Sequence, residues 1–300
     1  MSDQPRHNGI VVGVDGSACS KVAVKWAARE AAMRNAALTV VHVAYPGIGA
    51  WSGWGIPAAP LPENFARLQE DEARKVIDDA IDIVGAATQG DDRLRVNSEI
   101  LWSSVVPALV DLTKEAQMIV VGCRGRGALS SALLGSVSTA LAHHAHCPVA
   151  VMHDEAPQRE GFTHAPVLVG IDGSPASELA TTIAFDEASW RGVDLIALHT
   201  WSDADWRHFP GVEWSEIKAA AEETLAERLA GWRERYPDVT VSRTVVFDHP
   251  ARHLLEQSKS AQLVVVGSHG RGGFRGALLG SVSTAVVQAA QVPVIVARQR

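Results

Sequence analysis

Short, continuous apolar runs alternate with longer amphipathic stretches along the whole chain. Ile10–Val14 is an uninterrupted apolar run, as expected of a parallel strand that is covered on both faces. The next stretch predicts a helix that starts at Ser17 or Ser20, because it carries apolar residues on one face at helical spacing (Val22, Trp26, Ala27 and Ala31). Continued alternation predicts parallel strands joined by right-handed helical crossovers.

The remaining elements are predicted in matching pairs, one member in each half of the chain. The second strand is expected over Leu38–Val43 and Leu195–Leu198, and a charged helix over Leu68–Ala86 and Ala219–Arg235. The third strand is expected over Leu94–Ile100 and Val239–Val246, and the closing strand over Val149–Met152 and Val294–Ala297. A short helix before the fourth strand and a helix near Gly135 or Gly280 complete each half. The pattern therefore predicts an α/β fold with two tandem, doubly wound, parallel five-stranded sheets in a Rossmann-like sandwich.

The two halves are copies of one unit. Val11–Ser17 returns as Leu168–Ser174 after 157 residues, whereas Leu133–Thr139 returns as Leu278–Thr284 after 145 residues. The difference between 157 and 145 means that the first unit holds 12 extra residues, which we place in the Gly-, Pro- and Trp-rich stretch Tyr45–Pro62. We expect a first domain over residues 1–155, a linker over 156–166 and a second domain over 167–300.

Composition narrows the classes of function. The chain is 47% hydrophobic and 20% charged, with a net charge of −7, so we expect neither a nucleic acid nor an anionic membrane as partner. The polar start, Met1–Asn8, lacks the apolar core of a signal peptide. Cys19, Cys123 and Cys147 are odd in number and far apart, which argues against a disulfide framework and favours a cytoplasmic location.

A glycine pattern occurs once in each half, directly after the fourth apolar run. It reads G-x-x-G, nine residues and then G-S, and it begins at Gly122 and at Gly267. A strand, a glycine-rich loop and a helix N-terminus can cradle phosphate, because glycine permits close approach and the N–H groups of the first turn point at the anion. Each glycine alone could be a turn or packing residue, but two copies with identical spacing predict nucleotide binding.

These motifs resemble those of the universal stress protein family, in its ATP-binding subclass and most like the two-domain forms of mycobacteria. The resemblance covers Asn8–Asp154 and Pro166–Arg298. It rests on the glycine pattern, on the Asp that ends the first strand and on the His near the end of the second strand. It implies ATP in each half as cofactor, with Mg²⁺ or Mn²⁺ beside the phosphates as a further expectation.

The resemblance also implies which residues contact ATP, and it assigns no catalytic residue and no metal ligand. In the first half they are Gly13, Val14, Asp15, Val43, Gly122, Arg124, Gly125, Gly135, Ser136, Val137 and Ser138. In the second half they are Gly170, Ile171, Asp172, Thr200, Gly267, His269, Gly270, Gly280, Ser281, Val282 and Ser283. The serine hydroxyls are expected to donate to phosphate oxygens, or alternatively to act as helix N-caps.

Several of these residues keep a second interpretation. Asp15 and Asp172 contact adenosine if the resemblance holds, or simply form a turn, since Asp-Gly-Ser is a good turn sequence. Arg124 and His269 occupy equivalent positions, and arginine keeps a permanent positive charge whereas histidine titrates, so the charge of the two sites is expected to differ. Alternatively, both are solvated loop residues. We interpret Cys123 as a small loop residue.

The chain also contains histidines with no assigned binding role. We interpret His42 and His199 as structural residues at the ends of buried strands. His143, His144 and His146 resemble a metal-binding cluster, but their counterparts in the second half are not histidines, so a surface cluster at a helix end is favoured.

Two classes of function fit these motifs. The favoured one is a nucleotide-dependent regulator of stress response or growth, with a downstream protein partner that the sequence does not identify. The alternative is a slow ATPase or a phosphoryl- or nucleotidyl-transferring enzyme. It is weaker because the chain contains no G-x-x-x-x-G-K-[ST] loop, no kinase signature and no evident base beside the glycine loop.

The closing strands raise a question of assembly. Val149–Met152 and Val294–Ala297 are strongly apolar and lie at the end of each unit, where an unpaired sheet edge would be a liability. The resemblance implies that these edges pair within the chain, and the linker favours this arrangement by raising the effective concentration. Homodimerisation of whole chains is a further expectation.

Overall fold

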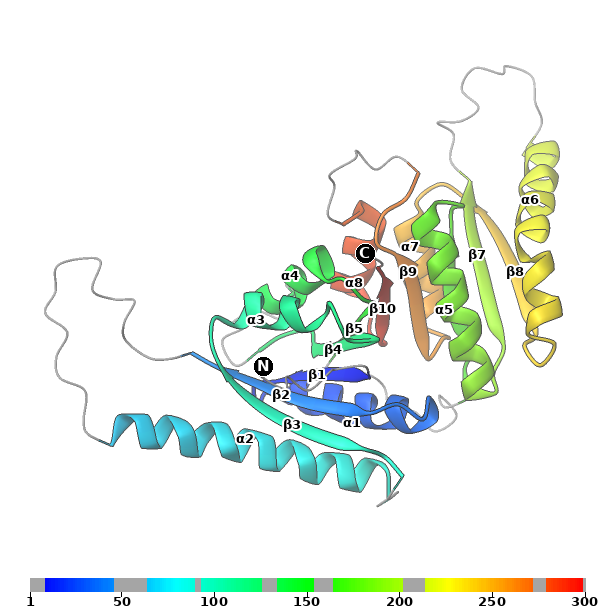
Figure 1. Cartoon of the computed structure of the whole chain (residues 1–300). Coiled ribbons are helices and arrows are strands. Elements are labelled where there is room, and N and C mark those ends of the chain that lie inside the picture. The colour runs from blue at the N-terminus through cyan, green and yellow to red at the C-terminus, as the bar shows by residue number, and fades with distance from the viewer. Residues whose placement is uncertain are drawn as a thin grey trace, which may run out of the picture.

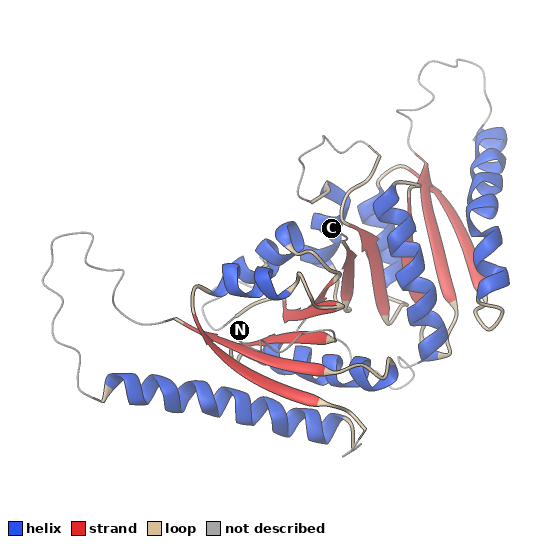
Figure 2. Cartoon of the chain, in the orientation of Figure 1, coloured by secondary structure: helices blue, strands red, loops and turns tan. Residues whose placement is uncertain are grey.

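The computed structural model describes residues 9–45, 64–89, 93–125, 134–153, 164–201, 214–271 and 279–298. Strands and helices alternate along both halves (Figures 1 and 2). The first half contains β1 (Ile10–Val14), α1 (Ala18–Met33), β2 (Leu38–Ala44), α2 (Phe65–Ala87), β3 (Val96–Trp102), α3 (Val105–Leu112), β4 (Met118–Gly122), α4 (Ser136–His144) and β5 (Val149–Met152). The second half contains β6 (Val167–Ile171), α5 (Pro175–Arg191), β7 (Leu195–Trp201), α6 (Trp214–Arg235), β8 (Val241–Phe247), α7 (Pro250–Ser258), β9 (Leu263–Gly267), α8 (Ser281–Ala289) and β10 (Val294–Ala297).

All these strands belong to one sheet, with the order β3-β2-β1-β4-β5-β10-β9-β6-β7-β8. Neighbouring strands within each half are parallel, and β5 and β10 join the halves as an antiparallel pair in which Ile295 lies opposite Ala150. In the first half the strand order reverses between β1 and β4, which is the switch point of a doubly wound sheet. The predicted fold class is confirmed. Homodimerisation of whole chains stays a prediction.

Two layers of helices cover the sheet, and each layer encloses an apolar core. One core gathers residues of α1, α2, α5 and α6 with alternate strand residues such as Ile10 and Val12, and the other gathers residues of α3, α4, α7 and α8 with Val11. Successive strand residues point to opposite faces, so a strand that is buried on both faces must be apolar throughout. This is why the central strands were the clearest elements in the sequence.

The predicted strand limits were less accurate at the outer strands. The closing strands have the predicted bounds, whereas β7 continues three residues beyond Leu198, to Trp201. These residues pair with β8, and the Trp201 ring lies 5.6 Å from that of Phe247. The backbone ladder extends the strand where the apolar pattern fades.

The predicted insertion lies almost wholly outside the described residues, and so does most of the predicted linker.

The C-terminal ends of α1 and α5 lie near each other (Figure 1), and four charged residues connect them: the buried Glu30 and Glu187 and the partly buried Arg34 and Arg191. Glu30 accepts hydrogen bonds from Arg34 Nε and Arg191 Nη2, each at 2.5 Å. Glu187 accepts from Arg34 and, at 2.9 Å, from Arg191 Nε. Each guanidinium also covers an indole ring of the other half, Arg34 over Trp190 and Arg191 over Trp26. The cluster therefore links the two halves reciprocally across the sheet junction.

Candidate functional site

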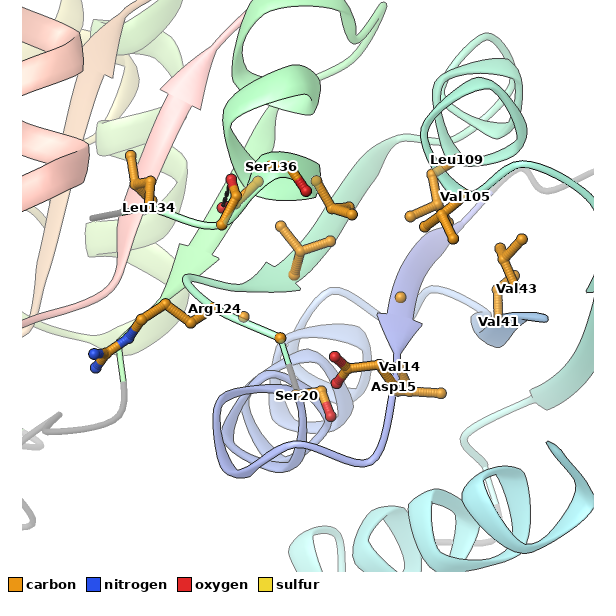
Figure 3. A pocket seen from close by; sticks show the side chains of 17 residues that line it. Val14, Asp15, Ser20, Val41, Val43, Val105, Leu109, Arg124, Leu134 and Ser136 are labelled. Carbon is orange, nitrogen blue, oxygen red and sulfur yellow. Dashed lines mark hydrogen bonds between the residues drawn. The ribbon is translucent and has the colours of Figure 1, made fainter. Parts of the chain in front are cut away.

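A cavity of about 530 Å³ lies at the carboxyl ends of β1 and β4, at the switch point of the first half (Figure 3). All eleven residues predicted for the first site line it, and they come from four segments of the chain: the end of β1, β2, the loop after β4 and the start of α4. The cavity volume falls within the range of about 300–1,000 Å³ that is typical of small-molecule pockets. The structure therefore brings together eleven predicted residues that span 126 positions of the sequence, from Gly13 to Ser138.

One end of the cavity is apolar. Val41 and Val43 of β2 face Val105 and Leu109 of α3 across it (Figure 3). Of these four residues, only Val43 was predicted from the sequence to contact the ligand. The i, i+4 spacing of Val105 and Leu109 was a visible signal for an apolar helix face, but nothing in the sequence showed which strand that face meets.

The opposite end is formed by backbone at the start of α4. Gly135 is the N-cap residue, with φ −65° and ψ 155°, and no side chain caps this helix among the described residues. By contrast, the Ser17 hydroxyl caps α1 by accepting from Ser20 N at 3.2 Å. The first-turn N–H groups of α4 therefore border the cavity as an uncapped cluster of donors, with the partial positive charge of a helix N-terminus.

Ser138 has a different role from the one expected. Its hydroxyl is buried and lies 3.0 Å from the carbonyl oxygens of both Cys123 and Gly135, so its proton is used within the protein. In the second half the Ser283 hydroxyl donates instead to the carbonyl of Gly267, one residue earlier in its loop, at 2.5 Å. Neither serine is the N-cap. Each hydroxyl ties its glycine loop to the helix, so the backbone N–H groups and Ser136 remain as the polar groups on this wall of the first cavity.

Asp15 forms the turn that its sequence suggested while it also lines the cavity. Its carboxylate accepts from Ser17 N at 3.0 Å, and Gly16 between them has φ 78°, a conformation that glycine adopts without strain. A Cβ atom on Gly125 would lie only 2.6 Å from Asp15 Oδ2, so the glycine loop closes directly onto the carboxylate. The turn and the cavity wall are compatible roles for one side chain.

The strand-end histidines are structural, as interpreted. His42 Nδ1 lies 2.7 Å from the Val14 carbonyl, and His199 Nδ1 lies 2.6 Å from the Ile171 carbonyl. A carbonyl only accepts, so Nδ1 carries the proton in both rings. Burial lowers the pKa of His199, and nearby cationic groups lower it further. Both rings fix the end of the first strand of their half, next to Asp15 or Asp172.

The second half repeats the backbone of this site with different side chains. Asp172 accepts from Ser174 N at 2.9 Å and from Arg271 N at 3.3 Å. A cavity there is lined by two predicted residues, Ser281 and Val282, together with the start of α7 (His249, Pro250, Ala251 and Arg252). The other predicted residues of the second half do not line it.

Three side chains make the second site distinct. His269 Nδ1 pairs with the Ser268 hydroxyl at 2.9 Å, where the first half has Arg124 and Cys123. Thr200 Oγ1, at the position of Val43, is buried without a hydrogen-bond partner in the part of the chain that the structure describes. The Arg124 side chain extends away from Val43 and Asp15 (Figure 3). The two sites therefore differ in polarity at both ends.

The histidine cluster lies at the end of α4. Burial lowers the pKa of His143, and the neighbouring His144 and Arg298 lower it further. Arg298 donates to the carbonyls of Ala142 and Ala145, at 2.6 and 3.0 Å, and so caps the same helix end. Within the described ranges, no group of three or more His, Cys, Asp or Glu side chains could hold a metal ion, and no helix is long and apolar enough to cross a membrane.

Comparison with known proteins agrees with this architecture. A model of the Universal stress protein family matches residues 8–153 and 164–298. Universal stress protein Rv2005c of Mycobacterium tuberculosis is 56% identical over 299 residues, covering 100% of both chains. Universal stress protein Rv2623 of the same organism is 53% identical over 299 residues, and the match covers 100% of this chain and 99% of that protein. A universal stress protein from Archaeoglobus fulgidus shares the fold, with a TM-score of 0.71 at 19% identity over 98% of this chain and 100% of its own.

A doubly wound sheet with a cavity at its switch point defines an α/β protein of the Rossmann-like type. The family model covers most of both halves, and the mycobacterial relatives match over the full length. The chain therefore belongs to the universal stress protein family. The resemblance to this family, in its two-domain form, is confirmed, whereas ATP binding stays a prediction.

Proposed function

We propose that this protein binds ATP in each half and acts as a nucleotide-dependent regulator of stress response or growth. The observation that carries the proposal is the polarity of the first cavity, which is apolar at one end and bordered by uncapped helix N–H groups at the other. Adenine is flat and largely apolar, whereas the triphosphate is anionic. A ligand with both parts complements both ends at once.

Each wall has a role in this proposal. The adenine ring would lie between Val41 and Val43 of β2 and Leu109 of α3, and the Asp15 carboxylate would accept hydrogen bonds from the sugar or base. The phosphates would bind to the backbone of the glycine loop and to the first turn of α4, beside Ser136. A divalent cation would be held chiefly by phosphate oxygens, since the ionisable side chains that line the cavity among the described residues are Asp15 and Arg124.

The same wall favours slow turnover. Phosphoryl transfer requires a group that orients the nucleophile beside the phosphates. The carboxylate on this wall, Asp15, already accepts from Ser17 N, and the protonated Nδ1 of His42 is bonded to Val14. We therefore expect any ATP hydrolysis to be slower than about 1 s⁻¹, the low end of ordinary enzyme rates.

Native mass spectrometry of the purified full-length chain with added ATP and Mg²⁺ tests the proposal. We expect two nucleotides on the wild-type protein and one on either Gly135→Val or Gly280→Val, because the new side chain would project beside the glycine loop at the helix start. The φ of Gly135, −65°, is compatible with valine, but a Cβ atom there would lie 3.2 Å from the Cys123 carbonyl oxygen and so press on the glycine loop. Gly231→Val is the matched control, since nothing lies within 4 Å of a Cβ atom there.

The occupancies separate the parts of the proposal. One nucleotide on the wild type that is lost in Gly135→Val would reject the second site and keep the first. No nucleotide on folded wild-type protein would reject the function. Loss of binding in Gly231→Val would show that the valine variants fail for another reason, and circular dichroism of each variant checks its fold.

A further inference from the structure

Cys19 and Cys123 lie 104 residues apart in the sequence, yet their Sγ atoms are 3.1 Å apart. Cys19 belongs to the first turn of α1, and Cys123 directly follows β4 in the glycine loop. Both side chains are buried, with exposed fractions of 2% and 4%. In the sequence the cysteines are far apart, and Cys123 was interpreted as a small loop residue. The fold instead joins two of the three thiols beside the candidate site.

The backbone holds both sulfur atoms in this position. A Cβ atom on Gly122 would lie 2.6 Å from the Cβ of Cys19, so α1 packs directly against the strand end. Cys123 N donates to the Met152 carbonyl at 2.7 Å, and the Cys123 carbonyl accepts from Gly135 N, also at 2.7 Å. The two thiols therefore stand on backbone that is anchored by β5 and by the start of α4.

The pair is a property of the first half alone. Ala176 and Ser268 occupy the equivalent positions of the second half, where the same backbone contacts recur without sulfur. The third cysteine, Cys147, is buried elsewhere, and burial raises the pKa of its thiol to about 12, which keeps it protonated and unreactive. The chain thus contains one thiol pair and one inert thiol.

We propose that Cys19 and Cys123 are an oxidisable dithiol that forms an intramolecular disulfide when the protein meets hydrogen peroxide. One sulfur attacks the peroxide and becomes a sulfenic acid, releasing water, and the second thiol attacks this sulfur to form the S–S bond with loss of a second water. Two thiols and one peroxide give one disulfide and two waters. A side-chain rotation and a shift of about 1 Å bring the sulfur atoms to bonding distance, about 2.05 Å.

The disulfide would tie α1 to the glycine loop of the first half and leave the second half unchanged. These two segments already meet, since the Ser17 hydroxyl donates to the Arg124 carbonyl at 3.3 Å. Oxidation would therefore add a covalent link between α1 and the glycine loop at one of the two sites. The modification itself does not depend on what either cavity binds.

Thiol counting on the full-length protein tests the proposal. The reduced chain, denatured and alkylated with iodoacetamide, should carry three labels by intact mass spectrometry. After treatment of the folded protein with peroxide, we expect one label, at Cys147, and a non-reduced digest in which the peptides of Cys19 and Cys123 are linked. Cys19→Ala and Cys123→Ser, which introduce the residues of the second half, should each give no linked peptides after peroxide; the variant that retains the attacking thiol should stop at the sulfenic acid, and the other should keep two labels.

Cys147→Ser is the matched control, with two labels before oxidation and none after it. Three labels on peroxide-treated wild-type protein would overturn the proposal. So would a disulfide that includes Cys147 or joins two chains, or conversion of either thiol of the pair to a sulfinic acid without a disulfide. Circular dichroism verifies that each variant is folded before treatment.

Discussion

We expect the free energy of unfolding to fall as the pH rises from about 5 to 8, because of the buried carboxyl pair Glu30 and Glu187. Burial, and then repulsion by Glu187, raise the pKa of Glu30 from its ordinary 4.5 to about 8. Burial also opposes the ionisation of Glu187, but Arg191 and Arg34 outweigh it and lower the pKa of that carboxyl. The folded pair therefore retains one proton that the unfolded chain releases.

The sign of the effect follows from this retained proton. When folding raises the pKa of a group, the group makes its full contribution to the free energy of unfolding at pH values below its pKa in the unfolded chain. That contribution is lost as the pH rises through its pKa in the folded protein. For Glu30 the window runs from 4.5 to about 8. At about 1.4 kcal/mol for each pH unit, the loss across this window is on the order of 4–5 kcal/mol.

Removing one carboxyl should remove this slope. In Glu30→Gln or Glu187→Gln, the remaining carboxylate faces two guanidiniums without a second acid beside it and stays ionised. We expect either variant to lie within about 1–2 kcal/mol of the wild type at pH 5.5 and to vary less with pH up to 8.5. The double variant leaves the partly buried Arg34 and Arg191 without a counter-charge, which should cost about 3–5 kcal/mol.

Urea unfolding of these proteins at pH 5.5, 7.0 and 8.5, followed by circular dichroism, measures the effect. Glu70→Gln is the control, because its partner Arg74 is 64% exposed and a surface ion pair contributes little. If each single variant lost 3 kcal/mol or more of its free energy of unfolding at pH 5.5, and the double variant lost the sum, both carboxylates would be ionised in the native protein. The reasoning would then be wrong.

Three further predictions concern the packing and the site. Gly122→Ala should destabilise the fold by about 1–3 kcal/mol in urea unfolding, because its Cβ would meet the Cys19 backbone at 2.7 Å, whereas Gly231→Ala should not destabilise it. Arg298→Ala removes two hydrogen bonds to carbonyls at the end of α4 and should cost about 1–3 kcal/mol in the same assay; an unchanged midpoint would contradict this. Asp15→Ala should weaken ATP binding by about 1–3 kcal/mol in calorimetry, and an unchanged affinity would leave Asp15 as a turn residue.

The sequence determined the elements and their repetition. Central strands such as β1 and β5 had the predicted bounds because a strand covered on both faces must be apolar at every position. The glycine pattern identified the family because glycine is required locally, where a loop closes on Asp15 and a helix begins. Signals of this kind depend on residues close together in the chain.

The tertiary structure decided which distant residues meet. The apolar end of the cavity depends on α3 packing beside β2, the thiol pair on α1 packing against the end of β4, and the charged cluster on α1 meeting α5. Each contact joins segments whose separation in sequence, from about 60 to more than 150 residues, carries no periodic signal. Proximity here follows from strand order and helix packing, and these are set by the burial of the whole sheet.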